Sequence, residues 1–147
     1  MDDFRTATGL EEMANLVAEP AAAYQFEPLS YRVLGAAVEV HRQLGPGFLE
    51  SVYAKALRLE LDHRDICWRS EVEIPVRYQG VVVGTHWLDL LVEETLIVEL
   101  KAVSAIHEVH TAQLTGYLRA ADLQIGLLLN FGQMPLGIKR IVNRYPG

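Results

Sequence analysis

The chain has 147 residues, of which half are hydrophobic, and its formal net charge is −6. This size and composition predict one globular domain with a substantial core, and the acidic balance argues against a protein that coats nucleic acid without sequence preference. No apolar run is long enough to span a membrane, and the N-terminus lacks the apolar segment of a signal peptide. A single cysteine, Cys67, excludes an internal disulfide and is typical of a reduced cytoplasmic protein with one semi-buried thiol.

Residues 1–28 are predicted to form an appendage, and residues 29–147 a single domain. Thr8 and Glu11 have the spacing of a helix capping box, so we expect a short helix that ends at Pro20. An alanine-rich connector then leads into the domain. The appendage would act as a docking arm or as a contact between subunits.

Hydrophobic periodicity predicts eight elements within the domain. A first helix covers 31–44, with Ser30 as its N-cap, and the Gly-Pro-Gly sequence at 45–47 ends it. A second helix covers 49–63, and Glu50 begins its otherwise apolar inner stripe. Strands follow at 70–78, 81–92 and 96–102, then a helix at 105–121 and strands at 123–131 and 136–143. This order predicts an α/β (α+β) fold with one central sheet.

Three ionisable residues interrupt two neighbouring apolar strands: Asp89, Glu99 and Lys101. A three-residue loop centred on Glu94 would place Asp89 directly opposite Glu99, with both side chains on one face of the sheet. Lys101 shares that face because strand side chains alternate, whereas Leu100 points to the other side. A one-residue slip of the register would separate the two carboxylates.

Two opposed carboxylates repel each other unless a cation lies between them. Lys101 would supply that cation in a purely structural salt bridge, in which the second carboxylate reaches the solvent. A divalent metal, Mg²⁺ or Mn²⁺, would supply it in a catalytic site, since both ions prefer hard oxygen ligands. Both interpretations stay open on these residues alone.

Several motifs resemble those of GxxExxY proteins, a small bacterial and archaeal group within the PD-(D/E)XK nuclease superfamily. The motif that names the group is present as Gly47-Phe48-Leu49-Glu50-Ser51-Val52-Tyr53. The resemblance extends, in the same order, to the stretches 39–46, 97–102 and 126–132, and to Gln113 and Tyr117. It covers roughly residues 29–143, which is nearly the whole chain.

The resemblance implies a restriction-endonuclease-like αβββαβ core, with a central mixed sheet flanked by helices. Asp89 takes the position of the metal-binding aspartate, and Glu99 and Lys101 take the (D/E)XK positions. Glu50 and the backbone carbonyl of Leu100 would complete the metal ligands.

Two further positions are implied by the same resemblance. Gln113 and Tyr117 resemble the QxxxY element of the RecB-like branch, and they would orient a phosphate or a water. They lie one helical turn apart, with His110 three residues before Gln113, so all three would lie on one side of the helix. One departure from the pattern is Leu88, which stands where the motif has a proline before the metal-binding aspartate, but many superfamily members lack that proline.

The implied function is metal-dependent hydrolysis of phosphodiester bonds in nucleic acid, with DNA as the expected substrate and Mg²⁺ (or Mn²⁺) as the cofactor. The alternative is a catalytically silent nuclease-fold module that binds nucleic acid or a protein partner, which the acidic net charge favours. A scaffold with an accidental acidic pair is a third interpretation. DNA repair or defence would be the pathway, a homodimer would suit cleavage of a duplex, and no membrane partner is expected.

The last residues are locally basic, since no acidic residue follows Asp122 and Lys139, Arg140 and Arg144 do. This end of the domain would either face a polyanion or form ordinary solvated surface.

Overall fold

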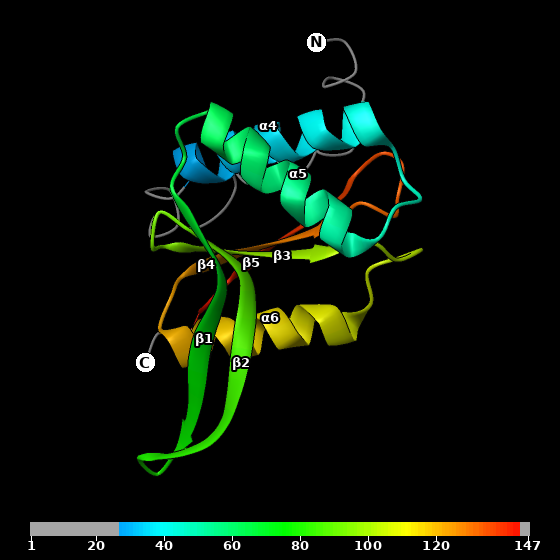
Figure 1. The fold of residues 1–147 in the computed structure, drawn as a ribbon. Coiled ribbons are helices and arrows are strands. Elements are labelled where there is room, and N and C mark those ends of the chain that lie inside the picture. Colours follow the sequence, from blue (N-terminus) through cyan, green and yellow to red (C-terminus); the bar gives the residue numbers. More distant parts are fainter. Residues whose placement is uncertain (1–26, 145–147) are drawn as a thin grey trace.

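The computed structural model describes residues 27–144 (Figure 1). The predicted appendage, with its short helix, lies almost entirely outside the described residues. The predicted order of elements is confirmed, and the bounds are α4 (Glu27–Leu44), α5 (Glu50–His63), β1 (Trp68–Tyr78), β2 (Val81–Val92), β3 (Leu96–Lys101), α6 (Glu108–Ala121), β4 (Ile125–Asn130) and β5 (Gly137–Val142).

The five strands form one mixed sheet in the order β1-β2-β3-β4-β5. β3 and β4 are parallel, and the other neighbouring pairs are antiparallel. The helices α4 and α5 cover one face of the sheet and α6 covers the other (Figure 1). This is the restriction-endonuclease-like architecture that the sequence predicts. No helix between residues 27 and 144 is long and apolar enough to cross a membrane.

A hydrophobic core lies on each side of the sheet. Val98 and Leu100 pack into the cluster beneath α4 and α5, and Ile97 packs into the cluster beneath α6. This alternation follows from the strand period of two, and it leaves β3 and β4 covered on both faces. Every residue of β4 is buried, so the end of β3 that carries the charged motif lies beside a rigid neighbour.

Three local predictions are wrong. Ser30 is not an N-cap: α4 begins at Glu27, because a proline such as Pro28 is tolerated in the first turn of a helix, and Ser30 lies buried inside it. The helix expected from residue 105 begins at Glu108. Cys67 is exposed rather than semi-buried, since it lies in the connection that precedes β1.

β2 leaves β3 at Asp89. The pairing between these strands comprises Val92 with Leu96, Leu91 with Ile97 and Leu90 with Val98, and it confirms the predicted register. The rest of β2 pairs with β1 alone, and this outer hairpin projects past α6 (Figure 1).

The hairpin also turns about its axis at this point. Leu90 packs beneath α4 and α5, whereas Leu88 packs on the side of α6. Glu71, next to the paired residues Ser70 and Val72 of β1, has φ +52°, which is the left-handed region that a glutamate rarely adopts. The distortion places Asp89 where the sheet divides into two branches.

Candidate functional site

Asp89 and Glu99 are joined by crossed hydrogen bonds at the fork between β2 and β3. The backbone N–H of Asp89 donates to Oε1 of Glu99 over 3.2 Å, and the backbone N–H of Leu100 donates to Oδ2 of Asp89 over 2.9 Å. Each carboxylate thus replaces the ladder bond that the diverging strands can no longer make. Asp89 and Glu99 thus lie next to each other, but the strand pairing ends at Leu90 and Val98, so side chains rather than backbone groups make the connection.

Glu99 is buried with only 6% of its surface exposed. Burial, followed by the neighbouring charge of Asp89, raises the pKa of Glu99 to about 8, and the charge of Lys101 opposes the shift. A carboxyl with such a pKa is protonated at neutral pH unless a cation joins it. The electrostatics of this pair therefore favour a cation bound next to the two carboxylates.

Lys101 does not provide that charge by direct contact. It is half-buried at the end of β3, and in the described part of the chain it forms no ion pair with either carboxylate. Glu99 does not reach the solvent either. The simple salt bridge, with one neutralised and one solvated carboxylate, therefore does not describe this site.

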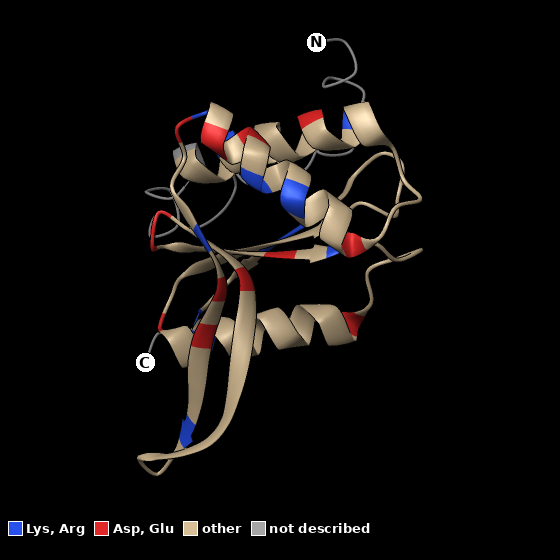
Figure 2. Cartoon of the chain, viewed as in Figure 1, with Lys and Arg blue, Asp and Glu red and all other residues tan. Residues whose placement is uncertain are grey.

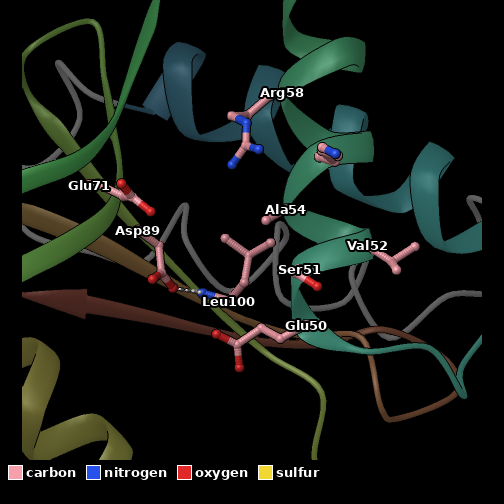
Figure 3. Close-up of a pocket in the computed structure, with 9 residues that line it drawn as sticks. Glu50, Ser51, Val52, Ala54, Arg58, Glu71, Asp89 and Leu100 are labelled. Atoms are coloured by element: carbon pink, nitrogen blue, oxygen red, sulfur yellow. Dashed lines mark hydrogen bonds between the residues drawn. The ribbon is translucent and has the colours of Figure 1, made fainter.

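Glu50 enters from the other side, at the first turn of α5 (Figure 3). Its side chain lines a pocket of about 570 Å³ together with Asp89 and Leu100. Partial burial, and then the charge of Asp89, raises the pKa of Glu50, and Lys101 opposes this shift. Glu50, Asp89, Glu99 and Lys101 therefore share one electrostatic environment, as the sequence predicts.

Tyr117 on α6 belongs to the same environment. Burial, then the charges of Glu99 and Asp89, raises the pKa of Tyr117. Its ring stacks on His86 of β2, with centroids 3.5 Å apart and planes inclined by 13°. Gln113 is exposed one turn earlier on α6. His110 accepts a hydrogen bond from the backbone N–H of His107, so it helps to begin the helix.

Three residues of the pocket were not singled out from the sequence. Arg58 points from α5 toward Glu71 and Asp89 (Figure 3). Lys55 also lines the pocket, one turn before Arg58 on α5. The sequence spacing could have indicated Arg58 as a pocket residue, because Glu50 and Arg58 are eight residues apart and share a helix face. The orientation of Glu71 depends on its unusual φ, for which its sequence position gives no sign.

Other motif residues support the fold and do not line the pocket. The Tyr53 hydroxyl donates to the carbonyl of Gly45 and accepts from the backbone N–H of Phe48, so it ties the Gly-Pro-Gly loop to α5. Asn130 bonds both backbone groups of Val103, as well as the N–H of Gly132 and the side chain of Gln133. A Cβ on Gly132 would lie 2.3 Å from the carbonyl oxygen of Val103, so the motif requires glycine there.

The donor set suits a hard divalent cation, since carboxylate and carbonyl oxygens are its preferred ligands. Within residues 27–144, however, no three His, Cys, Asp or Glu side chains converge closely enough to hold a metal ion. Asp89 and Glu99 each turn one oxygen toward the opposite backbone.

The comparisons with known proteins agree with this geometry. The sequence profile of the PD-(D/E)XK nuclease superfamily matches residues 27–141, so the chain belongs to this superfamily. The crystal structure of SSO0001 has a similar fold, with a TM-score of 0.52 and 13% sequence identity over 93% of this chain and 76% of that chain. A search of curated proteins finds no match.

Proposed function

We propose that the chain is a metal-dependent nuclease of the GxxExxY group that hydrolyses phosphodiester bonds of DNA. Membership of the nuclease superfamily supports the class of reaction. The observation that carries the proposal is the crossed pair at the fork, where Asp89 and Glu99 lie together and Glu50 faces them across an open pocket. A protein that needed this fork only for stability would gain from neutral side chains there.

Asp89 and Glu99 would hold Mg²⁺ or Mn²⁺, with Glu50 and the backbone carbonyl of Leu100 as further ligands. When bound, such an ion lowers the pKa of a water molecule and polarises the phosphate. The charge of such an ion would oppose the two causes that raise the pKa of Glu99, which are burial and then the charge of Asp89.

The remaining polar groups would act on the phosphate directly. Lys101 follows Glu99 on the same strand face, and its ammonium would stabilise the negative charge that builds on the phosphate oxygens. The Tyr117 hydroxyl, whose raised pKa keeps it protonated, would donate a hydrogen bond from α6. Gln113 would reach the same substrate from the exposed turn before it.

Hydrolysis of labelled DNA in the presence of Mg²⁺ or Mn²⁺ tests the proposal. We expect Asp89→Asn, Glu99→Gln and Lys101→Met each to lower the rate by at least about 100-fold, because each removes a ligand or a charge used in the transition state. Glu108→Gln is the matched control, since it removes an exposed acidic charge at the start of α6. Full activity of all three variants, with circular dichroism showing a folded protein, would contradict the proposal. RNA of the same sequence tests the choice of DNA.

A catalytically silent module remains a second candidate because of one observation: no three metal-binding side chains converge within residues 27–144. Calorimetric titration of the protein with Mg²⁺ and Mn²⁺ separates the two. Binding that disappears in Asp89→Asn supports the nuclease. A protein that binds neither ion but retains DNA or a protein partner supports the module.

The cellular setting follows as part of the same proposal. The single cysteine suits a reducing cytoplasm. DNA repair and defence against foreign DNA are processes that need phosphodiester cleavage, and a homodimer would bring two such sites to the two strands of a duplex. Sedimentation with and without DNA measures the oligomeric state.

A further inference from the structure

We propose that the site binds single-stranded nucleic acid, with an unstacked base lying on Trp87 and neighbouring phosphates held by Arg58 and Lys55. The inference rests on the proposed function for the position of the scissile phosphate, which is placed at Asp89. It adds the class of substrate and the residues that select it.

Two hollows meet at Asp89. The first, of about 570 Å³, is lined by Lys55 and Arg58, and the second, of about 430 Å³, is lined by Trp87. Glu71 and Asp89 line both hollows, so the surface runs continuously from the basic residues of α5, across the carboxylates, to the tryptophan. A path of this kind suits a chain molecule that passes the cleavage point and makes contacts on both sides of it.

Trp87 is 55% exposed, although it belongs to one of the most hydrophobic residue types in the chain. It lies two positions before Asp89 on β2, which places it about 7 Å away along the strand. A rigid aromatic ring beside a candidate phosphate site is what sequence-tolerant binding of single strands uses, since every base has a face that stacks on it. A base of the nucleotide next to a phosphate at Asp89 would therefore be close enough to stack on the exposed ring of Trp87.

Arg58 is held in place for a phosphate on the other side. Its guanidinium carbon lies 5.6 Å from the ring centroid of Trp68, and the Trp68 indole N–H donates to Oδ1 of Asp62 over 2.8 Å. The guanidinium is therefore oriented before any ligand arrives. Lys55 adds a second charge one turn earlier on α5. Figure 2 shows basic positions along the middle of α5 and acidic positions on the strands below it.

The ring selects single strands because a base within a duplex is stacked on both faces, so neither face is free to lie on an aromatic side chain. Lys55 and Arg58 favour a polyanion over an apolar protein partner on the α5 side of Asp89. Val81 and Val83 lie near the tip of the same hairpin, where the pairing with β1 shifts register, and are 63% and 62% exposed. A second copy of the chain docking on this hairpin would depend on these valines, whereas a nucleic acid strand would depend on Trp87, Arg58 and Lys55.

Fluorescence anisotropy of a labelled single strand of about 12 nucleotides, and of the blunt duplex of the same sequence, tests the inference. The full chain is used with Ca²⁺ in the Glu99→Gln background, so that cleavage does not interfere with binding. We expect the single strand to bind more tightly than the duplex. Trp87→Ala should weaken single-strand binding about tenfold, which is within the range for one base–aromatic stack, and Trp87→Phe should retain most of the affinity.

The basic residues are tested by salt dependence. Lys55→Gln and Arg58→Gln should each reduce the slope of log affinity against log salt concentration by about 0.7, and Arg58→Lys should restore it. Two matched controls should behave as the parent protein. Val83→Ala removes exposed apolar surface from the same hairpin, and Lys139→Gln removes an exposed charge at the opposite edge of the sheet.

Three outcomes overturn the inference: equal affinity for duplex and single strand, Trp87→Ala that binds like the parent protein, or a dimer in sedimentation that both Trp87→Ala and Val83→Ala dissociate. The last outcome would identify the hairpin as a contact between copies. If the protein hydrolyses DNA but Trp87→Ala binds and cleaves like the parent protein, the inference is wrong and the proposed nuclease stands. If the strand binds as expected but the protein cleaves no nucleic acid, the proposed nuclease is wrong and the inference stands.

Discussion

Two polar clusters lie next to each other on the central strands, where Lys101 of β3 pairs with Asn130 of β4. Asn130 is neutral and fully buried, and its side chain makes three hydrogen bonds to the backbone. The Asp89–Glu99 cluster is acidic, and its hydrogen bonds leave the pKa of Glu99 raised. The first cluster joins β4 to the loop after β3 through hydrogen bonds. In the second cluster, the described residues supply no positive charge in direct contact with the two carboxylates.

The difference teaches how to separate motif residues that fold the chain from those that act on a ligand. A structural polar group ends with its partners satisfied, because an unsatisfied buried group costs stability. A functional group is often left unsatisfied until the ligand arrives, so its pKa departs from the usual value. Stability measurements on the two clusters should therefore give opposite signs.

Asn130→Ala should give the largest change in stability. It removes two acceptor and two donor contacts of 2.8 to 3.1 Å and leaves the N–H groups of Val103 and Gly132 without this partner. We expect a loss of roughly 3 kcal/mol in the free energy of unfolding, measured as a lower urea midpoint at an unchanged slope. Gln133→Ala is the matched control, since it removes only one of these bonds and should cost less. Equal losses in the two variants would mean that Asn130 is not the centre of the cluster.

Glu99→Gln should instead stabilise the protein at high pH. The native pKa of Glu99, about 8, lies above its ordinary value of 4.5, so the native state binds more protons than the unfolded chain between these pH values. The free energy of unfolding of the parent protein therefore falls as pH rises through this window. Glutamine stays neutral and keeps an acceptor for the N–H of Asp89.

Melting temperatures measured without divalent ions should show this difference directly. The variant should match the parent protein near pH 4.5, exceed it increasingly up to pH 8, and keep a constant advantage of several degrees above that. Glu94→Gln is the control, because the pKa of Glu94 is lowered by its hydrogen bond to Arg69. A Glu99→Gln protein that melts below the parent at pH 8.5 would show that the pair stabilises the fold, and the comparison between the clusters would fail.

The parts that could be predicted from sequence are those set by short-range geometry. The register of the hairpin follows from a three-residue loop and the strand period, so the sequence could predict that Asp89 and Glu99 lie close together. The order of elements follows from the hydrophobic periodicity in the same way.

The parts that could not be predicted depend on long-range packing. The fork at Asp89 arises because the outer hairpin turns away from β3, and the left-handed backbone of Glu71 has no sequence signal. The stack of His86 on Tyr117 joins β2 to α6, and the contact of Arg58 with Trp68 joins α5 to β1. The burial of Ser30 depends on where α4 begins. A linear pattern contains none of these contacts.

The Arg69–Glu94 ion pair gives the smallest expected effect and tests whether bond length alone marks importance. Nε and Nη2 of Arg69 bond the Glu94 carboxylate over 2.8 and 2.9 Å, as short as the bonds of Asn130, but the two side chains are 56% and 64% exposed. Water competes for both partners, and salt screens their charges. Arg69→Gln should therefore leave the melting temperature and DNA hydrolysis unchanged at low and at high salt. If it destabilised the protein as much as Asn130→Ala, hydrogen-bond geometry would matter more than burial, and the contrast between satisfied and unsatisfied buried clusters would lose its basis.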